Sequence, residues 1–198
     1  MKIRYNAPVV LSFAFCATLV VVLSQLLGRE AILPIFSVPG KGSGFRIFSL
    51  DAFRLISHVI GHDGWAHLLA NFAFVLLIGP ILEEKHGSLP LLIMMLITAV
   101  VTGLINALFF TTGLLGASGV VFMMILLISF TNIRGGEIPL TFILVVLLFL
   151  AKEIIAIFET NNISEFAHII GGICGAIFGF FFRGRRGGEP VLPEGREA

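Results

Sequence analysis

Four polar side chains that can carry out chemistry interrupt long apolar stretches of this sequence. They are Ser118 within Gly116-Ala117-Ser118-Gly119, His168 within Ala167-His168-Ile169-Ile170-Gly171, and His67 and Asn71 within His67-Leu68-Leu69-Ala70-Asn71. A polar group in apolar surroundings is energetically costly, which makes it a candidate for function. A serine and a neutral histidine suit nucleophilic catalysis, because the imidazole can take the hydroxyl proton and later return it.

Ser118 is predicted to follow a turn and to open a helix. The first turn of a helix has unpaired backbone N–H groups and a partial positive charge, so these amides could receive an oxyanion while the serine attacks a carbonyl. Gly116 and Gly119 have no side chains to crowd that approach. The alternative interpretation is a packing surface of small residues, which membrane helices use often.

His168 is the only histidine in the second half of the sequence. Gly171, Gly175 and Gly179 follow it at a four-residue spacing, so they lie broadly on its helix face. Such a bare stripe would let the helix approach a neighbour closely and bring His168 to Ser118. The alternative interpretation is a packed helix with one interfacial histidine.

His67 and Asn71 are four residues apart, so both side chains project from one helical face. Their imidazole and amide N–H groups are suitable oxyanion donors; the alternative is hydrogen bonding between helices. His58, His62 and His67 cluster in the sequence, but they lack the cysteine or carboxylate partners of a usual zinc site. We therefore expect no metal and no cofactor, and the roles of His58 and His62 stay open.

The composition indicates that most of the chain lies in a lipid bilayer. Of the 198 residues, 57% are hydrophobic and 13% are charged, and the mean hydropathy is +1.03. Soluble domains have about 25% charged residues, so lipid must be the solvent here. The net charge of +1 gives no indication of a nucleic-acid partner. Cys16 and Cys174 fall in apolar runs, which is typical of buried small side chains and not of a disulfide scaffold.

Six transmembrane helices are predicted, because crossing about 30 Å of hydrocarbon takes about 20 apolar residues. We place them at residues 8–27, 66–82, 89–110, 115–131, 138–158 and 166–182. The first is too long for the core of a signal peptide, and no A-x-A cleavage site follows it, so we expect it to be retained. The break between the third and the fourth is expected at Thr111-Thr112-Gly113.

The distribution of basic residues predicts the orientation in the membrane. With six spans, one side collects Lys2, Arg4, Lys85, Arg134, Arg183, Arg185 and Arg186, so both termini are expected in the cytoplasm. The long connection 28–65 also carries four basic residues; it would lie outside, and its later part, 48–60, would lie partly in the interface. Residues 1–183 then form one membrane domain and 184–198 a disordered cytoplasmic tail. A bacterial cytoplasmic membrane is the expected location.

The three motifs together resemble the rhomboid family of intramembrane serine proteases. They are H-x-x-x-N, G-x-S-G and A-H-x-x-G, in that order in three different expected helices, and the resemblance extends from about Phe53 to Phe182. It implies an all-α bundle of six transmembrane helices around a water-accessible catalytic cavity. It also implies that Ser118 is the nucleophile and His168 the general base, without an acidic third member. His67, Asn71 and the backbone N–H of Ser118 would stabilise the oxyanion.

Further positions of the sequence match this family or depart from it. Phe53-Arg54 resembles a tryptophan–arginine pair in the first loop, and Glu83, four residues after Gly79, resembles a glutamate that braces the second span to that loop. Arg54 and Glu83 are therefore expected to be structural, as are Gly116, Gly119, Gly171 and Gly175. Phe122 replaces a frequent tyrosine; it is four residues after Ser118, so its ring is expected to lie against His168. Met123 and Leu126 replace small residues that are frequent in relatives.

The resemblance implies endoproteolysis of single-span membrane proteins near the outer face of the membrane. A binding protein like the derlins is one alternative, but such inactive relatives usually lack the serine or the histidine. A small transporter or proton path through His67 and His168 is another. It would need charged residues near the midplane of several helices, whereas only Lys152 and Glu153 occur, near the end of the fifth span. The sequence does not predict the natural substrate, its cleavage motif or the oligomeric state.

Overall fold

The computed structural model describes residues 5–46, 48–131 and 165–182, together with residues 140, 143, 144, 147 and 148. In chain order, its helices are α1 Pro8–Leu27, α2 Arg29–Ile32, the 3-10 turn η1 Leu33–Phe36, α3 Leu50–Ser57, the 3-10 turn η2 His58–Ile60, α4 Trp65–His86, α5 Ser88–Phe109, α6 Ser118–Thr131 and α8 Glu165–Phe181. Over the described ranges, β pairing is limited to one antiparallel bridge between Val38 and Leu114.

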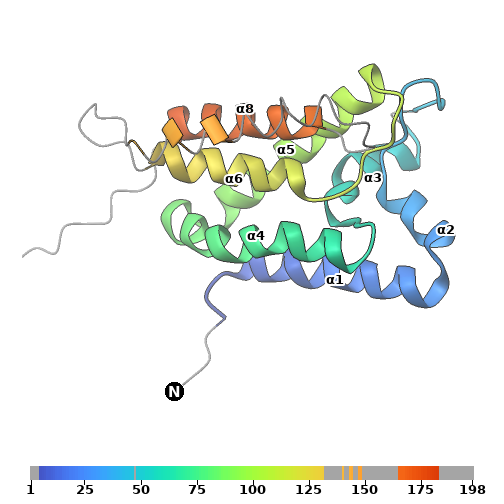
Figure 1. The fold of residues 1–198 in the computed structure, drawn as a ribbon, viewed down its shortest axis with the longest axis horizontal. Helices are drawn as coiled ribbons and strands as arrows, with labels where there is room; N and C mark the ends of the chain where they lie inside the picture. The colour runs from blue at the N-terminus through green and yellow to red at the C-terminus, as the bar shows by residue number, and fades with distance from the viewer. Residues whose placement is uncertain are drawn as a thin grey trace, which may run out of the picture.

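The long helices pack in two layers (Figure 1). α1 and α4 lie side by side in one layer, and α5, α6 and α8 make up the other. The short helices of the first loop gather at the end of the bundle where α6 begins. This arrangement brings the first loop next to the predicted nucleophile, although the end of that loop, Trp65, lies 53 positions before Ser118 in the chain.

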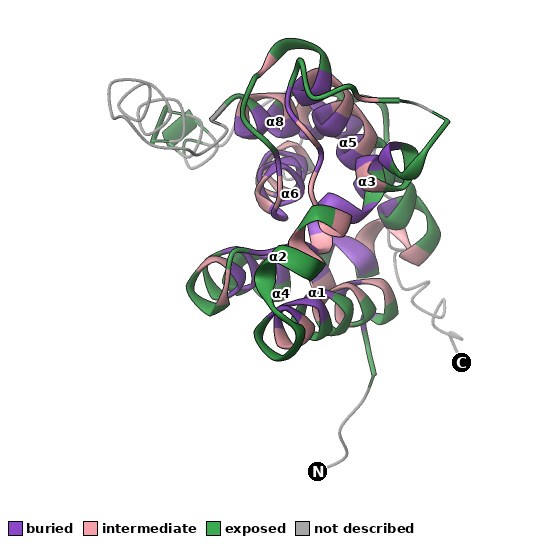
Figure 2. Ribbon diagram, turned by 90° about the vertical axis from the view of Figure 1, so that its right-hand side faces the viewer, coloured by how far each residue is buried: buried purple, intermediate pink, exposed green. Residues whose placement is uncertain are grey.

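α6 is the central helix of the described bundle. It packs against α4, α5, α8 and η2, and most of its ribbon is buried in Figure 2. Its sequence is apolar on all sides, which is the pattern of a helix enclosed by others. The fully buried side chains of its middle turns include Val120, Met123, Met124 and Leu127.

α8 packs on α6 through the glycine stripe that follows His168. A methyl group on Gly171 would overlap the backbone carbonyl of Gly119, and one on Gly175 would overlap that of Met123. At the far end of the stripe, a methyl group on Gly179 would meet the side chain of Phe130 instead. The bare face therefore lies against α6, and the two helix backbones touch where no side chain separates them.

The predicted spans agree with the described helices, with differences at their ends. α1 has the predicted limits, and α5 and α8 each start and end within one residue of theirs. α4 continues four residues past the predicted end at Leu82, and α6 starts at Ser118 and not at residue 115. The three residues before Ser118 form a loop that binds the first loop, so they do not enter the helix.

The described part of the chain bears out an all-α membrane architecture. Three of its helices, α1, α4 and α5, are long and apolar enough to cross a membrane, and α6 and α8 are shorter apolar helices. Of the predicted fifth span, 138–158, only residues 140, 143, 144, 147 and 148 are described, and they are helical. The predicted tail, 184–198, lies outside the described residues. The count of six spans and the cavity stay predictions.

Glu83 caps the start of α1, so the predicted contact with the first loop is wrong. Its carboxylate accepts hydrogen bonds from the backbone N–H groups of Val9 and Val10, both at 3.0 Å. Ser88 at the start of α5 donates a third, at 2.7 Å. Ala7, the residue before α1, offers no side-chain cap, so the first N–H groups of this helix need an acceptor from elsewhere. α4 runs on past Leu82 until Gly87, whose φ of 91° ends the helix.

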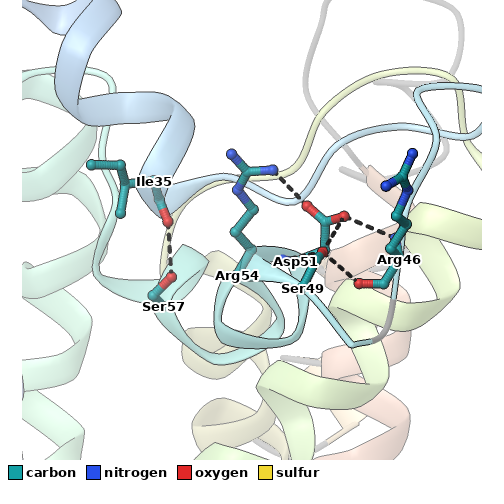
Figure 3. Close-up of polar contacts among 6 residues, drawn as sticks. All are labelled: Ile35, Arg46, Ser49, Asp51, Arg54 and Ser57. Atoms are coloured by element: carbon teal, nitrogen blue, oxygen red, sulfur yellow. Dashed lines mark hydrogen bonds and ion pairs between the residues drawn. The ribbon is translucent and has the colours of Figure 1, made fainter.

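The first loop has its own polar interior around α3 (Figure 3). The carboxylate of Asp51 accepts hydrogen bonds from the backbone N–H of Arg46 at 2.8 Å and from the guanidinium of Arg54 at 2.5 Å. These donors lower the pKa of Asp51, the Arg46 amide most of all. Phe53 and Ile56 point outward and are 50% and 42% exposed. A helix with polar groups inside and apolar groups outside suits a lipid interface; the interfacial position of residues 48–60 stays a prediction.

Glu83→Ala is expected to lower the free energy of unfolding by about 2 kcal/mol, because two N–H groups of α1 and the Ser88 hydroxyl lose a charged acceptor. Thermal unfolding of the purified protein in detergent measures the loss. Glu84→Ala is the matched control, since Glu84 is the adjacent carboxylate and is exposed. Equal melting temperatures for the two variants would contradict the capping role.

Candidate active site

The segment that leads to Ser118 is held by backbone hydrogen bonds from the first loop. Val38 and Leu114 exchange two N–H···O bonds, both at 2.9 Å. The N–H of Lys41 donates to the carbonyl of Phe110 at 2.6 Å. Gly40 packs directly on the backbone of Thr111, where a methyl group would not fit. The predicted break between the third and fourth spans is thus an irregular segment that the first loop holds on both sides.

The two residues directly before Ser118, Gly116 and Ala117, are also bound by the first loop. The N–H of Gly116 donates to the backbone carbonyl of His58 at 2.9 Å. The N–H of Ala117 donates to Nε2 of His62 at 3.3 Å. Gly116 has a φ of 115°, a left-handed conformation that glycine adopts at little cost and other residues avoid.

Ser118 is the first residue of α6, as the sequence predicted, and it is half-buried. The first backbone bond within α6 runs from the N–H of Val121 to the carbonyl of Ala117. The amides of Ser118 and Gly119 therefore belong to the first turn, whose N–H groups have no acceptor within the helix. The partial positive charge of a helix N-terminus acts at the same place.

His168 lies on the turn of α8 that faces the start of α6. Its neighbours on both sides contact Gly119: a methyl group on Gly119 would lie 3.3 Å from the carbonyl oxygen of Ala167, and Gly171 touches the backbone of Gly119. One turn further along α6, the ring of Phe122 stacks on the imidazole, with ring centroids 4.4 Å apart and planes at 15°. Ser118 and His168 are thus on facing turns of two tightly packed helices. The stacking was expected from the sequence; its effect on catalysis stays a prediction.

His67 directs its Nε2 atom towards the loop before Ser118. Nδ1 of this ring accepts the backbone N–H of Asp63 at 3.3 Å, so the neutral ring carries its hydrogen on Nε2. A Cβ atom on Gly116 would lie only 2.7 Å from Nε2, which shows how closely the ring approaches that residue. The Asp63 side chain is paired with Arg29 at the start of α2. His67 is therefore arranged as a hydrogen-bond donor beside the loop.

Asn71 lies one turn after His67 and is buried. Its Nδ2 atom donates to the backbone carbonyl of His67 at 2.9 Å. A side-chain amide has two such hydrogens, so this bond fixes the orientation of Asn71 and leaves a second hydrogen for another acceptor. The two residues share a face of α4, as the four-residue spacing predicted.

Comparison with known proteins identifies the family. Residues 49–185 match the family model of the Rhomboid domain, which is more than half of the chain. The chain belongs to the rhomboid family. The matched range includes every residue that the sequence suggested for the site, from Arg54 to Gly175, and with its apolar helices this rhomboid is an integral membrane protein.

Curated relatives of this rhomboid occur in several bacteria. The chain is 27% identical over 136 residues to Rhomboid protease GlpG of Haemophilus influenzae, an alignment that covers 66% of this chain and 69% of the relative. It is 26% identical over 181 residues to the protein of that name from Pectobacterium atrosepticum and 25% over 177 residues to that from Yersinia pestis. Both alignments cover 88% of this chain, which spans only 62% of the length of these two relatives.

No role was predicted for His58 and His62, yet both lie against the loop that precedes Ser118. His58 is 1% exposed and His62 is fully buried. The available signal was the occurrence of three histidines within ten residues, two just before a transmembrane helix and one in its first turn. Within the described ranges, no group of three or more histidine, cysteine, aspartate or glutamate residues could hold a metal ion. Of these three histidines, His62 binds the loop through its ring and His58 through its backbone carbonyl.

Burial keeps these two histidines neutral at physiological pH. Loss of hydration lowers the pKa of His58 to about 4. It also lowers the pKa of His62 to about 4, with a smaller contribution from the nearby His67. A neutral His62 is needed for its contact, because a protonated Nε2 would present a hydrogen to the N–H of Ala117.

The folded rhomboid is expected to lose stability as the pH falls from about 6.5 to about 4. In this range the unfolded chain takes up protons on His58 and His62 while the folded chain does not, and above it both states are neutral at these positions. The slope is at most about 1.4 kcal/mol per pH unit for each histidine. Thermal unfolding as a function of pH measures it, and His58→Gln should reduce the slope. A slope that His58→Gln leaves unchanged would exclude the contribution of His58.

Phe122→Ala is expected to lower turnover at least about tenfold, equal to about 1.4 kcal/mol of barrier, because the imidazole of His168 loses the ring that restricts its rotamers. Phe122→Tyr keeps the ring and should retain most activity. Turnover of a model membrane substrate measures both. Phe178→Ala is the control for a cavity alone, since Phe178 is equally buried in α8. If Phe122→Ala and Phe178→Ala have the same turnover as the parent, the ring does not support His168.

Proposed function

We propose that this rhomboid is an intramembrane serine endopeptidase, with Ser118 as nucleophile and His168 as general base. The observation that supports this pair most is the contact of α6 with α8. Gly119 lies against both Ala167 and Gly171, the neighbours of His168 along and around its helix. Phe122, one turn after Ser118, stacks on the imidazole itself.

In this mechanism the Ser118 hydroxyl attacks the carbonyl carbon of the scissile peptide bond, and His168 takes the hydroxyl proton. The resulting tetrahedral oxyanion collapses, the C–N bond breaks, and His168 returns the proton to the departing amine. A water molecule then attacks the acyl ester by the same path, which releases the acid product and restores the Ser118 hydroxyl.

Three kinds of donor are proposed for the oxyanion. The Ser118 amide is in the first turn of α6, where an N–H has no helical acceptor. The Nε2–H of His67 lies beside Gly116, since its Nδ1 accepts from Asp63. The second amide hydrogen of Asn71 is the third donor. Such fixed donors stabilise charge that develops in the transition state, and each contributes about 10²–10³ in rate.

The proposed substrates are single-span membrane proteins, cut near the outer face of the membrane. The bond must leave its helix locally, because the hydrogen bonds of a helix hide its peptide groups, so helix-weakening residues near the cut favour cleavage. Three relatives named as rhomboid proteases come from bacteria. We further propose that the protein lies in the bacterial cytoplasmic membrane with both termini in the cytoplasm. A water-accessible cavity would then bring water to Ser118.

Ser118→Ala is expected to abolish cleavage of a model single-span substrate and labelling by a fluorophosphonate probe, while the melting temperature stays that of the parent. This variant loses the nucleophilic oxygen but keeps the contact between α6 and α8, which is made by glycines. Ser129→Ala is the matched control, because Ser129 is on the same helix and only donates to the carbonyl of Ile125.

Cleavage by purified Ser118→Ala at the parent rate would overturn the assignment. A parent protein that binds the substrate but neither cuts it nor reacts with the probe would favour the derlin-like alternative. The presence of both Ser118 and His168 argues against that outcome.

A further inference from the structure

His62 is a buried side chain that the proposed chemistry does not use. It follows η2 and precedes α4, and its side chain has no exposed surface. A polar group buried in this way must have its hydrogen bonds made within the protein. The partners of its two ring nitrogens therefore indicate what the residue does.

The two ring nitrogens have different and complementary partners. Nδ1 lies 3.3 Å from the backbone carbonyl of Ile60, which can only accept, so the hydrogen is on Nδ1. Nε2 then has a lone pair, and it accepts the N–H of Ala117 at 3.3 Å. This arrangement fixes one neutral tautomer and ties the chain before α4 to the residue before Ser118.

The same imidazole also contacts the ring of His67. The two centroids are 5.0 Å apart and the rings meet edge to face at 67°. On its other side the His62 ring meets Phe72, with centroids 5.6 Å apart. His62 is thus fixed by packing and in contact with His67, one of the groups proposed to surround the oxyanion.

The loop needs such a support because of Gly116. Glycine has more backbone freedom than any other residue type, and Gly116 lies two positions before the nucleophile Ser118. The peptide N–H groups on both sides of its flexible bonds are bound, that of Gly116 by the carbonyl of His58 and that of Ala117 by His62. The next amide along the chain is that of Ser118. The direction in which the Ser118 N–H points therefore depends on how the Gly116 and Ala117 peptides are held.

We propose that His62 is a positioning residue of the proposed site: its ring aligns the Ala117 peptide and the His67 imidazole, so that the N–H of Ser118 and the Nε2–H of His67 converge on one oxyanion. The inference rests on the proposed function of Ser118. It extends that function to a residue which touches neither the substrate nor the reacting atoms. The competing interpretation is that His62 only fills and stabilises the core.

The test compares two replacements of nearly equal length. His62→Gln keeps an acceptor that can reach the N–H of Ala117, whereas His62→Met fills similar space without a strong acceptor. The expected result is that His62→Met lowers kcat at least about tenfold with KM nearly unchanged, since alignment of oxyanion donors acts in the transition state. His62→Gln should recover most of the lost turnover. The labelling rate of Ser118 by a fluorophosphonate should follow the same order.

Phe178→Leu is the matched control for packing. Phe178 of α8 is buried in the same hydrophobic cluster as Phe72 and its ring contacts Phe182, so this variant should lower the melting temperature and leave kcat close to that of the parent. All rates are measured at a temperature where melting curves show each variant to be folded.

The outcomes separate this inference from the proposed function. If the parent shows no Ser118-dependent cleavage and no labelling, the proposed function fails. If the parent is active and His62→Met and His62→Gln have equal kcat, the positioning role is overturned. Loss of folding in both variants would assign His62 to the core and would also overturn it. A selective loss of kcat in His62→Met with recovery in His62→Gln supports it.

Discussion

The close contact of α6 with α8 is the interaction on which the rest of this structure depends. Glycines on α8 meet backbone carbonyls of α6, so the helices are held at a distance that a single methyl group would change. In a bilayer, where apolar side chains gain little by leaving lipid, such backbone contact is a main source of helix association. It also fixes His168 relative to the first turn of α6. Packing and proposed chemistry therefore have one physical origin.

The first loop contributes acceptors, which is why it belongs to the site although it spans no membrane. Backbone carbonyls of Val38 and His58 and the ring of His62 bind three N–H groups of the segment before α6, those of Leu114, Gly116 and Ala117. An irregular segment within a membrane protein has to satisfy its backbone polar groups from within the protein. The first loop supplies these hydrogen-bond acceptors as far as the N–H of Ala117, and the next N–H groups along the chain are the N-terminal amides of α6.

The sequence predicted the helices well because lipid leaves one strong signal, the length of apolar runs. α1 has the predicted limits, and the helical faces of His67 with Asn71 and of the glycine stripe are as expected. The errors come from groups whose partners are distant in the chain. Glu83 looked like the end of a span because it is charged, whereas its charge is buried against the start of α1. The part played by His62 depends on a contact 55 residues away, which spacing alone does not reveal.

The glycine stripe of α8 implies that this helix tolerates few mutations along its whole contact with α6. At Gly171 and Gly175 an added methyl group meets backbone atoms, and at Gly179 it meets the Cβ atom of Phe130, which no change of rotamer can move. Random substitution at the three positions should therefore leave mostly glycine in a library selected for activity. The spacing of the two helices is fixed along the full length of the stripe and not only beside His168.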